Sequence, residues 1–279
     1  MKRSPVVAGS FYPSSTFRLK DSIEECFLSP LGPGYLPDKT DKPLEKNLAV
    51  IVPHAGYIYS GPVAAHAYVQ VAKSGKPDLV VLVGPNHTGF GSQIGVWDRG
   101  EWLTPLGALE VCEDAAQIFL ENCDEALVEY EAHMNEHSLE VQLPFLQYLF
   151  TEFKILPISV FPVFINVCQK IAAGLDAIAA RYSSTLFVFS TDLNHYESQE
   201  ITKQKDETAI QKIVDKDPVG LYTAVAKQKI TMCGLSSIAA LLFMKSFDKP
   251  KLLKHATSGD VTGDRAQVVG YASFICEQV

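Results

Sequence analysis

The 279-residue sequence lacks the features that mark membrane, secreted and nucleic-acid-binding proteins. No apolar run approaches the ~18 residues that are needed to span a bilayer. The start, MKRSPVVAGSFYPSS, has two basic residues but no continuous apolar stretch after them, so we expect no secretory signal there. No block of Lys or Arg stands out, and the net charge is −8. We therefore expect neither nucleic acid nor an anionic membrane as a partner.

Closely spaced cysteines are also missing. The six cysteines are scattered, and no two have the C-x-x-C spacing. In a chain of this length, such a pattern is typical of a reduced, cytoplasmic protein rather than of a disulfide scaffold. There is no internal repeat, and the one segment with the composition of a flexible loop, residues 28–43, is short for a linker. We therefore expect a single domain over residues 1–279.

What the sequence does contain is a series of short apolar runs that alternate with helical stretches. The runs are continuous rather than interrupted by polar residues, which is typical of strands covered on both faces. Residues 92–112 instead alternate and turn, which predicts a hairpin. The pattern predicts a three-layer α/β/α fold with a mixed, largely parallel sheet. The expected strands are residues 47–54, 78–87, 154–161, 185–195 and 266–277, and the expected helices include residues 16–27 and 61–73.

Three of the expected strands end in polar residues that can take part in chemistry. VIVPH ends in His54, VVLVGPNH ends in His87, and LFVFSTDLNH ends in Asp192, Asn194 and His195. In open α/β sheets, ligands bind beyond the carboxyl ends of the strands. A single histidine of this kind is more often a capped strand end or a loop residue than a ligand. Their repetition in the same context predicts a shared crevice.

Cys233 is the fourth indication of a site. It lies in KITMCGLSSIAALLF, at the expected start of an apolar helix, where backbone N–H groups and the helix dipole favour a thiolate. The alternative is a small buried hydrophobic residue, which is our interpretation of the other cysteines. Two imidazoles and one anionic ligand leave positions open on a metal ion. The sulfur also suits Cu(I) or Zn(II), so the residue types alone do not identify the metal.

The segment from His133 to His137 matches the H-x-x-E-H signature of one class of zinc protease. That motif needs both histidines on one face of a helix, but here the helical pattern starts only after His137. We expect His133 to lie in the preceding loop and to point elsewhere, and His137 and Glu140 to line the crevice, where they orient ligands or substrate. His66 is expected to pack inside its helix, and His255 to lie on the surface.

Seven blocks, spread in order over nearly the whole chain, resemble the Memo family (AmmeMemoRadiSam system protein B type). They are RSPVVAGSFYP, VPHAGYIYSGPVAAHAY, GPNHTG, NEHSLEVQLPFL, STDLNHY, MCGLSSI and TSGDVTGDRAQVVGYAS. The resemblance implies a fold similar to that of the class III extradiol dioxygenases, which are non-haem Fe(II) enzymes. It also implies iron or copper as cofactor, with zinc as a further candidate and no organic cofactor. A radical-SAM protein and an AMMECR-like protein are the partners that it suggests.

The resemblance also assigns roles to individual residues. It makes His54 and His87 metal ligands, and His195 the catalytic acid/base with Asp192 beside it. The third ligand of the dioxygenases is a carboxylate, whereas the Memo pattern places Cys233 there, which argues against ring cleavage. Further residues expected to contact substrate or support the ligands are Asn86, Tyr57, Asn194, His137 and Glu140.

Three functions remain open from the sequence. The first is a metal-dependent redox enzyme of dioxygenase-like type, which retention of His195 and Asp192 favours, because passive metal binding needs no general base. The second is a metal-binding protein without turnover, which Cys233 favours. The third is a peptide- or protein-interaction module on an inherited dioxygenase fold, with the crevice holding a small molecule or peptide.

Overall fold

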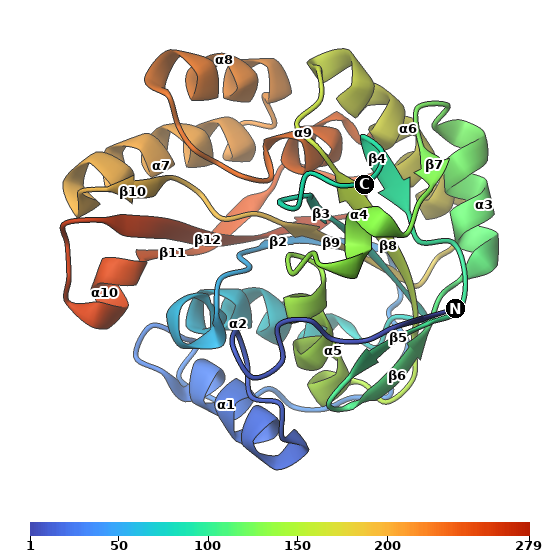
Figure 1. The fold of residues 1–279 in the computed structure, drawn as a ribbon, viewed down its shortest axis with the longest axis horizontal. Helices are drawn as coiled ribbons and strands as arrows, with labels where there is room; N and C mark the ends of the chain where they lie inside the picture. Colours follow the sequence, from blue (N-terminus) through green and yellow to red (C-terminus); the bar gives the residue numbers. More distant parts are fainter.

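The centre of the fold is a nine-stranded sheet, seen in the computed structural model, which describes all 279 residues (Figure 1). Its middle strands run parallel and are, in spatial order, β2 (Leu48–Val52), β9 (Thr185–Ser190), β3 (Leu79–Pro85) and β8 (Lys154–Val160). Every residue of β2, β9 and β3 is buried, as expected for strands that are covered on both faces.

Antiparallel strands flank the parallel centre, so the predicted mixed sheet is confirmed. Beside β2 lies β12 (Val268–Glu277), which also pairs with β10 (His195–Glu197) and β11 (Lys251–Thr257). At the opposite edge, β4 (Ile94–Val96) is antiparallel to β8, and β7 (Leu127–Val128) completes the sheet.

The hairpin predicted for residues 92–112 is divided between two sheets. The fully buried β4 joins the main sheet, whereas β5 (Glu101–Thr104) and β6 (Gly107–Glu110) form an antiparallel hairpin. Buried and partly exposed residues alternate along β5, because only one of its faces packs on the core. The short β1 (Lys2–Arg3) pairs with β5 and attaches the N-terminus to this small sheet.

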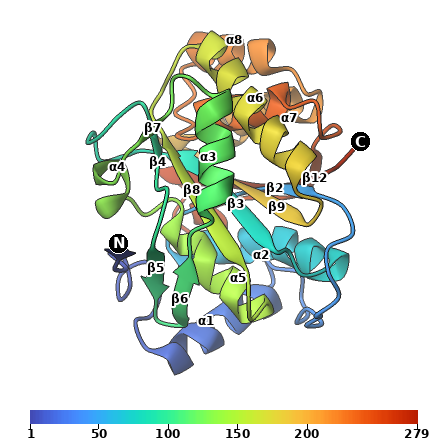
Figure 2. The same ribbon diagram turned by 90° about the vertical axis from the view of Figure 1, so that its right-hand side faces the viewer.

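Helices cover both faces of the main sheet, as Figures 1 and 2 show. One layer consists of α1 (Thr16–Leu28), α2 (Tyr57–Ser74) and α5 (Leu143–Leu149). The other consists of α3 (Glu113–Asn122), α6 (Ile165–Arg181), α7 (Gln199–Val214), α8 (Pro218–Gln228) and α9 (Leu235–Phe243), and the short α4 (Glu131–Met134) and α10 (Ser258–Thr262) lie in connections. None of the helices combines the length and apolar character that a bilayer crossing requires.

Successive residues of the central strands enter opposite cores, which explains their unbroken apolar sequence. Along β2, Val50 packs with the α1, α2 and α5 layer, whereas Ala49 and Ile51 pack with the α3, α6 and α9 layer. Burying a Val or Ile side chain contributes roughly 1.5–3 kcal/mol, so both faces contribute to stability. A polar side chain introduced into these strands would be buried on either face of the sheet.

The strand predicted for residues 185–195 is interrupted. β9 ends at Ser190, and the chain then crosses toward the β12 edge, where His195 begins β10. Backbone groups outside regular pairing hold this crossing, because Thr191 N donates to the Val52 carbonyl and Leu193 N to the Gly270 carbonyl. His195 therefore belongs to the edge strand β10, which β12 and β2 separate from β9.

Candidate metal centre

A crevice of about 700 Å³ opens beyond the carboxyl ends of the central strands. His54 follows β2, His87 follows β3 and Asp192 follows β9, while Cys233 lies just before α9. Parallel neighbours end at the same edge of the sheet, so the strand order itself brings these side chains together. The crevice is lined by Ser10, Phe11, His54, Ala55, Gly56, Tyr59, His87, His137, Asp192, His195, Tyr196, Thr231, Cys233 and Val269.

Hydrogen bonds fix the protonation of the His54 ring. Its Nδ1 lies 2.7 Å from Ser190 Oγ, and that hydroxyl already donates to the Ser138 carbonyl at 2.8 Å. Nδ1 must therefore be the donor, which leaves a lone pair on Nε2. Burial, together with the neighbouring histidines, lowers the pKa of His54 well below its usual value, so the ring is neutral. Its Nε2 points at Cys233 Sγ, 3.2 Å away.

Glu136 fixes the His87 ring in the same way. Glu136 Oε1 lies 3.0 Å from His87 Nδ1, which leaves Nε2 for the crevice. Burial alone would raise the pKa of Glu136, but the hydrogen bond and charge of His87 lower it to about 2. Burial opposes a charge on His87 as well, yet the Glu136 carboxylate raises the pKa of His87 above its usual value. The His87 side chain is 34% exposed, so one side of the site is open to solvent.

The Cys233 sulfur is placed by the loop after β9. Its Sγ accepts a hydrogen bond from Asp192 N at 3.2 Å. The sequence predicted a thiolate here, but α9 begins only at Leu235, and burial and then the Asp192 carboxylate raise the pKa of the thiol. The expected effect of the helix start is therefore outweighed. The sulfur becomes a thiolate only with a cation beside it.

These three residues fit one transition-metal ion. A nitrogen of each imidazole and Cys233 Sγ lie within 4.8 Å of one another. With metal–nitrogen and metal–sulfur bonds of about 2.0 and 2.3 Å, two tetrahedral ligands lie about 3.5 Å apart, which is close to the 3.2 Å between His54 Nε2 and Cys233 Sγ. His54, His87 and Cys233 could thus hold an ion that accepts nitrogen and sulfur ligands.

A second cluster shares His87 with this site and contains Glu136 and His137. Its carboxylate is already occupied, because Glu136 also accepts hydrogen bonds from His87 N, His137 N and Ser138 N. The His137 ring stacks on His87 with centroids 4.8 Å apart. This cluster therefore orients His87 rather than forming an independent metal site.

The family of the chain follows from comparison with known proteins. Residues 3–275 match the family model for Memo-like proteins. The chain belongs to this family. It is 48% identical over 276 residues to a MEMO1 family protein of Thermotoga petrophila, covering 99% of both chains. It is 46% identical over 275 residues to one of Metallosphaera sedula, covering 97% of this chain and 98% of the relative. The family membership predicted from the sequence is confirmed.

A solved structure shares the α/β fold of this Memo-like chain. It is the crystal structure of an uncharacterized protein from Escherichia coli K12, with a TM-score of 0.55 and 11% identity. The match covers 82% of this chain and 98% of that chain. At this level of identity the likeness concerns the fold alone, and it agrees with the fold class predicted from the sequence.

His195 and Asp192 also line the crevice. Nδ1 of His195 is buried without a hydrogen-bond partner, and burial lowers the pKa of this ring. Asp192 uses Oδ1 to accept a hydrogen bond from His54 N at 2.8 Å, and burial raises the pKa of its carboxyl to about 7. Asp192 thus holds the His54 backbone, while His195 presents a neutral ring to the crevice.

Four other residues named from the sequence lie outside the lining of the crevice and hold its frame. Glu140 was expected to line the crevice, but it is fully buried behind it and binds Arg3. Tyr57 donates its hydroxyl to the Val141 carbonyl at 2.7 Å. Asn86 accepts from Thr88 N and so orders the loop after His87, and Asn194 accepts from Thr231 N beside His195.

The remaining histidines differ in how well the sequence placed them. His133 lies in α4 and its Nε2 bonds to the Gly95 carbonyl at 2.9 Å, away from His137, so the protease motif does not form. His66 is partly buried in α2 and bonds to the Leu31 carbonyl. His255 was expected on the surface, but its side chain is only 21% exposed because it pairs with the buried Asp206 at 2.8 Å.

Glu136 and Ser190, which fix the two imidazoles, were not predicted from the sequence, and Glu136 offers a direct test. We expect Glu136→Gln to lower metal affinity about 10- to 100-fold, because the lost charge no longer holds His87 in its ligand orientation. Competition against a chromophoric zinc chelator measures this change. Glu131→Gln, on the exposed side of α4, is the matched control. Equal affinities for the two variants would show that Glu136 does not support the site.

Proposed function

We propose that this protein binds one iron or copper ion through His54, His87 and Cys233 and carries out redox chemistry on a small molecule in the crevice. The observation that carries the proposal is the orientation of the His54, His87 and Cys233 side chains toward one another. Both imidazoles use Nδ1 to bond to the protein, and His54 Nε2 faces Cys233 Sγ at 3.2 Å. A bound ion of this kind would supply electron transfer and open positions for substrate and O2.

His195 supplies the acid–base group that such chemistry needs. Its pKa is lowered by burial, so the ring is neutral at pH 7. A neutral imidazole in the same crevice as the metal ligands can accept a proton from the hydroxyl of a bound substrate. A protein that only stores metal has no use for this group.

The test separates metal binding from turnover. We expect His195→Asn to keep its metal, measured by elemental mass spectrometry after anaerobic purification, and to lose about 100-fold or more of O2 consumption with catechol-like substrates. Asn has similar polarity but cannot take up the proton. Unchanged turnover in this variant would remove His195 from the chemistry, and a wild-type protein that takes up neither iron nor copper would end the proposal.

The sulfur ligand favours one alternative, namely copper handling without turnover. Cys233 provides a soft thiolate where the dioxygenase pattern has a carboxylate, and soft ligands select Cu(I). Stoichiometric copper with no O2 consumption in the wild-type protein would support this second function over the first.

Metal uptake should release protons. Because burial raises the pKa of Cys233, its thiol is protonated at pH 7 and must lose that proton to bind as a thiolate. His87, whose pKa is raised by Glu136, releases a further fraction of a proton, and this fraction grows as the pH falls through the raised pKa. We expect about one proton per ion at pH 8 and more at pH 6, with affinity increasing with pH. Anaerobic calorimetry with Zn(II) in buffers of different ionisation enthalpy measures this number, and a value near zero would contradict a thiolate ligand.

A further inference from the structure

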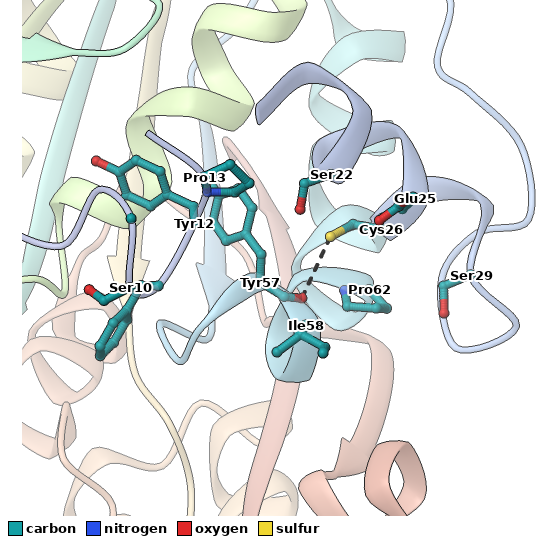
Figure 3. Close-up of a pocket in the computed structure, with 12 residues that line it drawn as sticks. Ser10, Tyr12, Pro13, Ser22, Glu25, Cys26, Ser29, Tyr57, Ile58 and Pro62 are labelled. Carbon is teal, nitrogen blue, oxygen red and sulfur yellow. Dashed lines mark hydrogen bonds between the residues drawn. The ribbon is translucent and has the colours of Figure 1, made fainter. Parts of the chain in front are cut away.

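A second cavity, of about 470 Å³, lies between the N-terminal segment, α1 and the first turns of α2 (Figure 3). Pro13, Tyr57 and Pro62 give it apolar walls, and Ser22 and Glu25 stand on the α1 side. It contains none of the metal ligands, although its wall at residues 10–11 also borders the crevice. The cavity can therefore hold a ligand independently of the metal centre.

The charge of this cavity comes from one exposed carboxylate on α1. Glu25 is the only charged residue in its lining, and it forms no ion pair in the structure. Pro62 has no N–H, so the Ile58 carbonyl one turn earlier in α2 lacks its usual helical donor. Both residues line the cavity. A free carboxylate and an underused carbonyl beside apolar walls call for a cation on an aliphatic stem.

The thiol at the back of the cavity does not change this chemistry. Cys26 is 4% exposed, and its Sγ donates to the Tyr57 carbonyl at 3.6 Å, the contact drawn in Figure 3. Burial raises the pKa of this thiol to about 12, so it is not a nucleophile at neutral pH. The cavity is thus suited to a reversible, noncovalent ligand.

We propose that this cavity binds the Lys or Arg side chain of a partner polypeptide. The aliphatic stem would lie on Tyr57 and Pro62, with the cation at Glu25. Ile58 at the edge of the cavity is 72% exposed, so it offers an apolar contact to the residue next to the basic one. A polypeptide can place the side chain next to its basic residue on Ile58, and a free amine cannot make this second contact.

The experiment compares two capped tripeptides, Leu-Lys-Leu and Leu-norleucine-Leu, by chemical-shift titration of the full-length protein. Norleucine keeps the stem and lacks the ammonium. We expect the lysine peptide to bind at least about fivefold more tightly at low salt. Glu25→Gln should abolish this preference, whereas Asp21→Asn, one turn earlier on α1 and outside the cavity, should keep it.

Each other outcome would overturn the proposal. Equal affinity for the two peptides would show that the ammonium group does not contribute to binding. Equal effects of Glu25→Gln and Asp21→Asn would show that the preference for lysine comes from the net charge of the surface and not from Glu25. Butylamine binding as tightly as the lysine peptide would make the site one for small amines. Cys233→Ala should leave peptide binding unchanged. If this variant no longer bound the peptide, the peptide site would be the crevice instead of this cavity.

Discussion

Cys233→Ala is expected to lose its stoichiometric metal while keeping its fold. Metal content should fall from about one equivalent to below about 0.1, because the variant loses the one ligand that becomes anionic on binding. The thiol is only partly buried, so removing one sulfur leaves a small space at the crevice rather than a cavity in the core. Elemental mass spectrometry of anaerobically purified protein, together with circular dichroism, measures both properties.

His54→Ala and His87→Ala should give the same result for metal. His87→Ala leaves Glu136 with three backbone donors, so no buried charge is left without partners and the fold should survive. Cys168→Ala is the matched control. It removes a buried thiol that does not line the crevice, and the Tyr222 hydroxyl that contacts that thiol still donates to a backbone carbonyl. Wild-type metal content in all three ligand variants would show that these residues are not the metal ligands.

Arg3→Ala is expected to lower the free energy of unfolding by about 3–5 kcal/mol. The Arg3 guanidinium is buried, lies 2.7 Å from Glu140 Oε2 and also donates to the carbonyls of His133 and Glu136. Its removal leaves the Glu140 carboxylate buried without a cation. Hydrogen bonds from Val6 N and the Tyr12 hydroxyl remain, so we expect the lower half of this range.

Lys2→Ala provides the control for Arg3. Lys2 pairs with Glu101 at 3.0 Å, but its side chain is 67% exposed, and such surface pairs contribute less than about 1 kcal/mol. Urea denaturation of both variants measures the contrast. Similar losses for Lys2→Ala and Arg3→Ala would mean that the buried pair does not stabilise the N-terminal segment.

The sequence predicted the part of the site that depends on strand ends. His54 and His87 follow continuous apolar strands, and a parallel sheet brings such ends together whatever the details of packing. The residues that support the ligands could not be predicted in this way. Glu136 contacts His87 across 49 residues and Arg3 contacts Glu140 across 137, and no local pattern reports such pairs.

Two expectations failed because local sequence preferences were outweighed by tertiary structure. The position of Cys233 before an apolar helix favoured a thiolate, but burial beside Asp192 has the larger effect on its pKa. The apolar run ending at His195 suggested one strand, but the backbone beyond Ser190 finds its hydrogen-bond partners on β2 and β12 instead. In both cases the deciding neighbour is distant in sequence.

The position of β2 has a consequence for the order of events during synthesis. β2 leads to His54, yet its two neighbours in the sheet, β9 and β12, both come much later in the chain. On the ribosome, His54 thus has no completed frame until β12 has been translated, and pairing over such sequence separations is slow. A nascent chain that has not reached β12 contains both histidines without the complete crevice, so binding of the proposed metal should follow the pairing of β12 with β2.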